Sequence, residues 1–229
     1  MNTMRQTLGK FTTGVGTLVF PLYLNEPDTK FDNSEDKIKF KATIRLQGDE
    51  AAKLVKETEE HWERWLDMVK TGLGKKPKIQ AKNVQWYTPD TPVWDDIGES
   101  AEKMITELQE GEAVFKMSAK ANRKMRDGSF QPQTVPIYDA KLQLIPAAAL
   151  PMIGFGTTAA LHGQFYGWTT QAGVASMSLL LRSVQLVDVR EPGAATDSPD
   201  DCGFTSTDGF VSDTDTFTDT IPSESNGDF

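Results

Sequence analysis

Charge is distributed so unevenly along this chain that it divides the chain into two parts at Arg190. All 24 lysines and arginines lie in residues 1–190, and ten of the 33 acidic residues come after Arg190. Residues 1–190 thus hold 24 bases and 23 acids, a net charge of +1, whereas residues 191–229 carry a net charge of −10. A near-neutral body with an acidic extension is typical of a folded domain with an interaction tail. We therefore expect one domain in residues 1–190 and a separate tail in residues 191–229.

The tail is rich in Asp, Ser, Thr and Gly and contains no leucine, lysine or arginine. Such a composition cannot bury enough apolar surface to offset the entropy of ordering the chain, so we expect the tail to be disordered. Phe204, Phe210, Phe217 and Phe229 are spaced through it. Acidic residues with spaced aromatic residues suit docking on a basic, aromatic-lined groove. The tail residues that we expect to contact partners are Asp213, Asp215, Phe217, Asp219, Asp228 and Phe229.

The expected compartment follows from the cysteine content and from hydropathy. Cys202 is the single cysteine of the sequence, so an internal disulfide is excluded, and the chain shows no zinc-type spacing of cysteines. A reducing cytoplasm is the natural compartment for such a chain. The sequence contains no apolar run of the roughly 18 residues that a transmembrane helix needs.

Residues 1–190 show more strand patterns than helix patterns. In residues 37–42, lysines alternate with Ile38, Phe40 and Ala42, which predicts a strand with one face in the core. Apolar residues at helical spacing predict helices over residues 49–73, with Asp49 as N-cap, and over residues 96–109. Several short strands and two helices favour a mainly β (α+β) fold, a small antiparallel barrel with two inserted helices. The other predicted strands cover residues 15–24, 78–87, 113–121, 135–144, 153–168 and 174–189, with a turn at residues 127–128.

Three clusters of basic residues are interleaved with apolar and aromatic residues, over residues 37–45, 75–82 and 116–126. A groove for single-stranded nucleic acid needs cations for phosphates and flat side chains for unpaired bases. Alternating lysines also simply solvate the outer face of a barrel, and for one cluster alone neither interpretation is favoured. Three clusters together favour nucleic-acid binding. The phosphate contacts that we expect are Lys39, Lys41, Lys78, Lys82, Lys116, Lys120, Arg123 and Lys124.

The aromatic residues fall into two groups. Trp62 and Trp65 lie on the apolar stripe of the first predicted helix, so we expect them in the core together with Phe40 and Phe115. Others lie at strand ends or in loops, where a ring is free to stack on a base. Gly167 permits a bend and the close approach of a ligand in the last of these stretches. The candidates for stacking are Trp86, Tyr87, Phe165, Tyr166 and Trp168.

The sequence contains no constellation of residues that indicates an enzyme, a metal site or a cofactor. His61 has Glu57 four residues before it but no further ligand, so we expect it on a solvated helix face. His162 has no acid or nucleophile nearby in the sequence. The Gly-X-Gly stretches at residues 14–16 and 154–156 lack the further glycines and the lysine of a phosphate-binding loop.

Several stretches together resemble the single-stranded DNA-binding proteins of bacteriophages, in particular the small replication proteins of short-tailed phages. They are the strand over residues 37–46 followed by a long helix, Phe115-Lys-Met-Ser-Ala-Lys120, and Val135-Pro-Ile-Tyr-Asp-Ala140. The stretches Gly154–Thr157, Gly173–Leu179 and Ser183–Asp188, and the acidic end at Phe229, complete the resemblance.

The resemblance implies an OB-fold barrel with inserted helices that binds and protects single strands without sequence specificity, during phage DNA replication and recombination. It also implies a tail that recruits replication partners (polymerase, helicase or primase) and competes with DNA, a location in the cytoplasm of the infected host, and a possible homodimer. The alternative is a virion structural or assembly protein with a β-sandwich body and a solubilising acidic arm.

Overall fold

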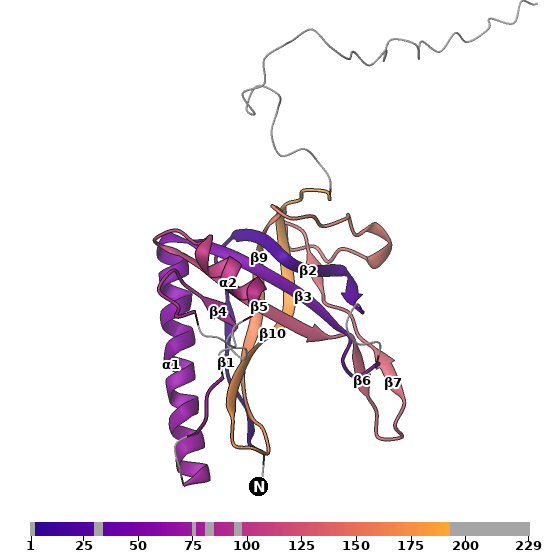
Figure 1. Cartoon of the computed structure of the whole chain (residues 1–229). Coiled ribbons are helices and arrows are strands. Elements are labelled where there is room, and N and C mark those ends of the chain that lie inside the picture. The colour runs from indigo at the N-terminus through magenta and orange to yellow at the C-terminus, as the bar shows by residue number, and fades with distance from the viewer. Residues whose placement is uncertain (1–2, 30–33, 75–76, 81–84, 94–97, 193–229) are drawn as a thin grey trace, which may run out of the picture. The chain divides into compact units, whose positions relative to one another are not determined.

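The computed structural model describes residues 3–29, 34–74, 77–80, 85–93 and 98–192 (Figure 1). Residues 193–229 of the predicted acidic tail lie outside these residues. No described helix is long and apolar enough to cross a membrane. The strands are β1 (Arg5–Thr12), β2 (Gly16–Asp28), β3 (Lys39–Gln47), β4 (Trp86–Tyr87), β5 (Glu112–Lys120), β6 (Asn122–Lys124), β7 (Phe130–Pro132), β8 (Ile137–Tyr138), β9 (Thr158–Thr169) and β10 (Ala175–Asp188), and the helices are α1 (Gly48–Leu73) and α2 (Glu99–Thr106).

Five strands close into a ring in the order β9, β2, β3, β5 and β10, because β10 also pairs with β9. Four of the five pairings are antiparallel, and the pairing of β10 with β5 is parallel. The prediction of an antiparallel barrel is therefore wrong in this respect, and the sheet is mixed. The reason is geometric: strand direction cannot alternate all the way around a closed ring with an odd number of strands.

Side-chain alternation separates the core of the ring from its outer face. Along β9, every second residue is buried, among them Leu161 and Phe165, while the residues between them are partly exposed. Phe115 on β5 and Ile44 on β3 lie directly opposite each other and are fully buried. This is the pattern that one apolar and one polar sheet face produce. The predicted core positions of Phe40 and Phe115 are confirmed.

Helix α1 follows β3 directly and packs on one side of the ring (Figure 1). Its Trp65 and Val69 are fully buried in a cluster with Ala175 of β10. A Cβ on Gly167 of β9 would lie 2.4 Å from the Trp65 ring, so only glycine lets helix and strand approach this closely. The helix ends at Gly74, in the left-handed conformation that glycine favours.

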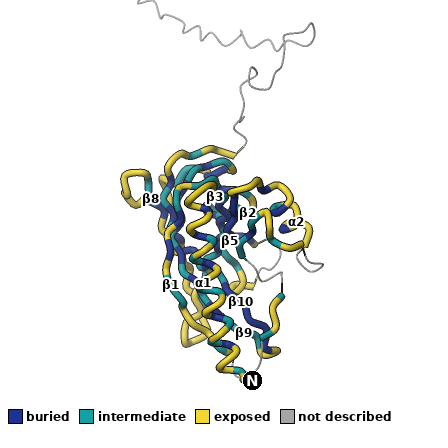
Figure 2. The backbone as a smooth tube through the Cα atoms, turned by 90° about the vertical axis from the view of Figure 1, so that its left-hand side faces the viewer, coloured by how far each residue is buried: buried dark blue, intermediate teal, exposed yellow. Residues whose placement is uncertain are grey.

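The short strand β4 pairs with β5 in the sheet, and the helix α2 packs on this pair to form a smaller, separate cluster. Tyr87 of β4 is buried with Val114 of β5 and with Ala101 and Ile105 of α2. The outer side of α2 is exposed (Figure 2). Both β4 and α2 come from the segment between α1 and β5. This insertion covers the half of β5 that contains Val114 and Lys116.

Several element boundaries differ from the predicted ones. The strand β1 was not predicted, and α1 begins at Gly48 without the side-chain cap that we expected from Asp49. The predicted strand over residues 135–144 is reduced to Ile137–Tyr138 because the chain turns at Leu142, which has a positive φ. The predicted turn at residues 127–128 is confirmed, and it joins β6 to β7.

Candidate nucleic-acid interface

An open groove of about 640 Å³ lies on the outer face of the ring, where β10 runs between β5 and β9. The alternation described above directs Ser118, Tyr166 and Ser178 into it, while their neighbours Met117, Phe165 and Leu179 are in the core. The groove is lined by Arg5, Lys39, Ser118, Ala119, Lys120, Gln133, Thr134, Val135, Tyr166, Trp168, Ser178, Leu180, Leu181 and Arg182.

The lining residues include four cations and no carboxylate. Lys39 lies directly opposite Lys120 in the pairing of β3 with β5, and like charges in this position destabilise a sheet. Burial lowers the pKa of Lys39, and the neighbouring charges of Lys120 and Lys41 lower it further. An anion bound here would offset both effects, because negative charge favours the protonated amines.

Two aromatic side chains, Tyr166 and Trp168, line the same groove from β9 and are partly exposed. The Trp168 Nε1–H donates a hydrogen bond of 3.0 Å to Ser178 Oγ on β10. This bond holds the indole ring in one orientation, so less rotamer entropy is lost when a base binds. An exposed ring beside cations is the arrangement on which unpaired bases stack, at about 1–3 kcal/mol for each base.

Arginines frame the two rings. Arg5 of β1 lies directly opposite Trp168 in the pairing of β1 with β9. The guanidinium group of Arg182 donates to Gln164 Oε1 from Nε, at 2.9 Å, and from Nη2. Because this contact leaves other guanidinium N–H donors of Arg182 unused, the group is already oriented and still able to bind a phosphate oxygen.

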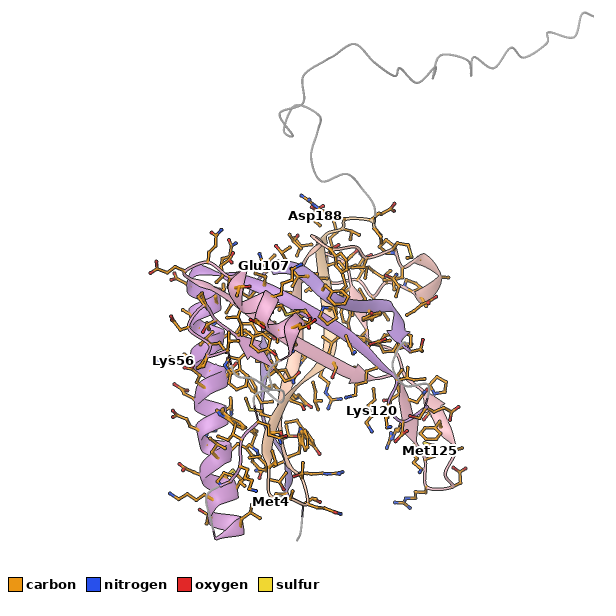
Figure 3. All side chains as sticks on the ribbon, in the orientation of Figure 1. Met4, Lys56, Glu107, Lys120, Met125 and Asp188 are labelled. Atoms are coloured by element: carbon orange, nitrogen blue, oxygen red, sulfur yellow. The ribbon has the colours of Figure 1, made fainter. Side chains whose placement is uncertain are left out.

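The β6–β7 hairpin extends this basic surface. Figure 3 shows Lys120 at the end of β5 and Met125 on the hairpin that follows. Arg123 and Lys124 are exposed on this hairpin, and Lys124 Nζ lies 5.8 Å from the centre of the Phe130 ring. The groove and the hairpin together thus hold seven described cations: Arg5, Lys39, Lys120, Arg123, Lys124, Arg126 and Arg182.

The prediction that Phe165 stacks on bases is wrong. Its side chain is fully buried, and its ring centre lies 4.5 Å from those of Phe11 and His61. Phe165 precedes Tyr166, so the alternation of β9 directs it to the opposite face. The expectation of a solvated His61 is also wrong, because its ring packs on Phe165 and its Nδ1 is buried.

Tyr87 and Lys116 form a covered pair outside the groove. The Lys116 Nζ donates a hydrogen bond of 2.7 Å to Tyr87 Oη and lies 4.7 Å from the centre of its ring. Burial lowers the pKa of Lys116 to about 8, with a further contribution from Lys41, and burial raises the pKa of Tyr87 to about 12. Stacking by Tyr87 is therefore excluded in this structure, because its ring is buried beneath α2.

Two further predicted residues are engaged in contacts within the protein. The Lys41 Nζ forms an ion pair with the buried Asp28, at 2.5 Å from its Oδ2. Trp86 packs against the core and lies 6.3 Å, ring centre to ring centre, from Trp62. Neither side chain lines the groove, and their predicted contacts with nucleic acid stay predictions.

The remaining predicted residues are Lys78, Lys82 and those of the tail. Lys78 is exposed beside the start of β10, where its carbonyl accepts a hydrogen bond from the Ala175 N–H. It lies next to a groove strand without lining the groove. Lys82 and the tail residues Asp213, Asp215, Phe217, Asp219, Asp228 and Phe229 lie outside the described residues.

Sequence reasoning missed two of the four groove cations. Arg182 carried a signal that was not used, since on β10 it shares the alternation of Ser178 and Leu180. Arg5 carried none, because its position depends on the pairing of β1 with a strand about 160 residues later. Among the described residues, no three histidine, cysteine or acidic side chains gather as metal ligands.

No family model and no curated protein sequence matches this chain. It is similar in structure to gp2.5, a single-stranded DNA-binding protein encoded by bacteriophage T7, with 17% sequence identity and a TM-score of 0.58 over 91% of this chain and 100% of that chain. It is also similar to the single-stranded DNA-binding protein from bacteriophage Enc34 in complex with single-stranded DNA, with 13% identity and a TM-score of 0.52 over 82% of this chain and 95% of that chain. The predicted resemblance is therefore confirmed at the level of structure: this chain has the fold of bacteriophage single-stranded DNA-binding proteins.

Proposed function

We propose that this protein is an OB-fold protein, without enzymatic activity, that binds single-stranded DNA in the groove between β5, β10 and β9. The observation that carries the proposal is the composition of this groove, four cations and two partly exposed aromatic rings with no carboxylate. Cations neutralise phosphates and aromatic faces stack on bases of any identity, so binding is independent of sequence. The two structural neighbours named above are themselves single-stranded DNA-binding proteins, which supports the same function here.

Selectivity for single strands follows from the position of the rings. In a duplex the faces of the bases are covered by their neighbours, so Tyr166 and Trp168 gain nothing from it. A coating that prefers unpaired bases removes hairpins and protects the strand, which helps a polymerase and a helicase or primase during replication.

The acidic tail acts in this proposal as a tethered competitor and as a docking segment for replication proteins. Its net charge of −10 is opposite in sign to that of the groove. A segment on a short flexible tether reaches an effective concentration on the order of millimolar. This is enough to displace weakly bound nucleic acid from the groove and too little to exclude long single strands.

The test is a titration of the full-length protein and of a variant ending at residue 192 with fluorescently labelled oligo-dT and with duplex DNA. Tight binding to oligo-dT, weak binding to duplex and a loss of affinity of orders of magnitude between about 50 and 200 mM salt are expected. The truncated variant should bind oligo-dT more tightly at low salt. Equal affinities would disprove the competitor role, and an absence of binding by both proteins would favour the virion-protein alternative.

A further inference from the structure

A second, smaller hollow of about 250 Å³ continues the outer face of β9 beyond the groove. Side chains that alternate along β9 place Trp168 and Tyr166 in the groove, Gln164 between the two hollows and His162 in the second one. From Tyr166 to His162 the strand advances by about 13 Å. Tyr138 of β8 lines the opposite wall, because β8 pairs with β10 on the side away from β9.

The surface between the two hollows is basic. Lys10 of β1 lies directly opposite Gln164, so its side chain is on the same face of the sheet, and it is exposed. Arg182 contacts Gln164 from the β10 side. A nucleic-acid strand that passes over Gln164 therefore has a cation on each side to bind its phosphates. A ligand without phosphates would gain nothing from these two cations.

The second hollow is lined by the flat rings of Tyr138 and His162, by apolar and uncharged polar side chains, and by no lysine, arginine or carboxylate. His162 Nδ1 is hydrogen-bonded to Thr12 Oγ1 at 3.0 Å, which orients the imidazole ring. Leu142 leaves 70% of its surface exposed and has a positive φ, a costly conformation for leucine. Asp139 fixes the loop that carries Leu142, since its carboxylate accepts hydrogen bonds from the Lys141 and Gln143 N–H groups.

We propose that this hollow is a second base-binding subsite, in which Tyr138 and His162 contact a base of the same single strand that fills the groove. The proposal rests on the proposed function. Continuity along β9 and β10 and the cations on both sides of Gln164 identify the occupant as an extension of that strand. The consequence is a longer binding site, in which affinity continues to rise after the groove has been filled.

The test compares the affinity of the full-length protein for oligo-dT of stepwise increasing length, for the wild type, Tyr138→Ala and Tyr138→Phe. The wild type should gain affinity in two steps, and Tyr138→Ala should lack the second step, a loss of about five- to a hundredfold on long oligomers with none on short ones. Tyr138→Phe keeps the ring and should retain the second step.

Two further variants make the result independent of folding effects. Leu142→Asp changes an exposed residue, and aspartate tolerates a positive φ, so the variant should fold and weaken binding of long oligomers alone. Trp168→Ala should weaken binding at every length. If Trp168→Ala has this effect while Tyr138→Ala and Leu142→Asp both retain the second step, the second subsite is disproved and the groove stands. If Trp168→Ala has no effect at any length, the proposed function itself fails.

Discussion

The two halves of β5 carry similar lysines in different surroundings. Lys116 and Lys120 share one face of the strand, but Lys116 is hydrogen-bonded to Tyr87 of the neighbouring strand β4, on which α2 packs, whereas Lys120 is exposed in the groove. The pKa of Lys116 falls to about 8 because burial disfavours its charge. Alternation along a strand thus decides which face a lysine occupies, and elements from elsewhere in the chain decide whether that lysine meets solvent.

The largest expected effect on DNA affinity comes from the groove, at the open half of β5 that carries Lys120. Replacing both Tyr166 and Trp168 by alanine should weaken binding to oligo-dT by about 2–6 kcal/mol, because two stacking contacts of about 1–3 kcal/mol each are lost. Fluorescence anisotropy at constant salt measures this change. Tyr87→Phe is the control on the covered half and should bind like the wild type. A similar loss of affinity in Tyr87→Phe would mean that the covered half also contacts DNA.

On the covered half, apolar replacement should stabilise the fold. In the double variant Lys116→Met with Tyr87→Phe, both partners of this hydrogen bond are removed together, so neither the amine nor the hydroxyl is left behind without the other. Because a buried ammonium group costs more than an apolar side chain of similar size, we expect the free energy of unfolding at pH 7 to rise by about 1–2 kcal/mol. Urea denaturation measures it, and a decrease would show that the pair contributes net stability.

Sequence reasoning found part of the groove and misplaced other residues for two different reasons. Tyr166 and Trp168 line the groove, where the predicted stacking on bases is sterically open, whereas Phe165, which precedes Tyr166 on β9, was assigned to the wrong face because the aromatic residues of this stretch were treated alike. Tyr87 failed for a different reason, since α2 covers it and no local pattern reports that contact. Long-range pairing and covering layers therefore limited the site prediction.

A smaller effect should distinguish Lys120 from Lys116 in the salt dependence of DNA binding. Lys120→Ala should reduce the slope of log affinity against log salt concentration by about 1, as expected for the loss of one phosphate contact. Lys116→Ala should leave this slope unchanged, because its amine is bonded to Tyr87 and does not line the groove. The slopes are measured with oligo-dT over a series of salt concentrations. Equal reductions in both variants would contradict the distinction between the two halves.

The smallest expected effect is on the pH dependence of stability. It concerns the side of the ring where α1 packs His61 on Phe165. Burial lowers the pKa of His61, and Arg64 lowers it further, against the opposing effects of Glu57 and Glu60. Between the unfolded and folded pKa values the unfolded chain binds more protons, so stability declines as the pH falls below about 6.5.

His61→Leu should remove this part of the pH dependence, because it removes the group that is protonated. It should also raise stability at pH 7 by up to about 1 kcal/mol, since the buried Nδ1 has no hydrogen-bond partner among the described residues. Urea midpoints at pH 5, 6 and 7 for wild type and variant give the difference that isolates His61 from the other titrating groups. If this difference does not grow towards pH 5, the imidazole is protonated as easily in the folded protein as in the unfolded chain. His61 is then more open to water than its packing on Phe165 indicates.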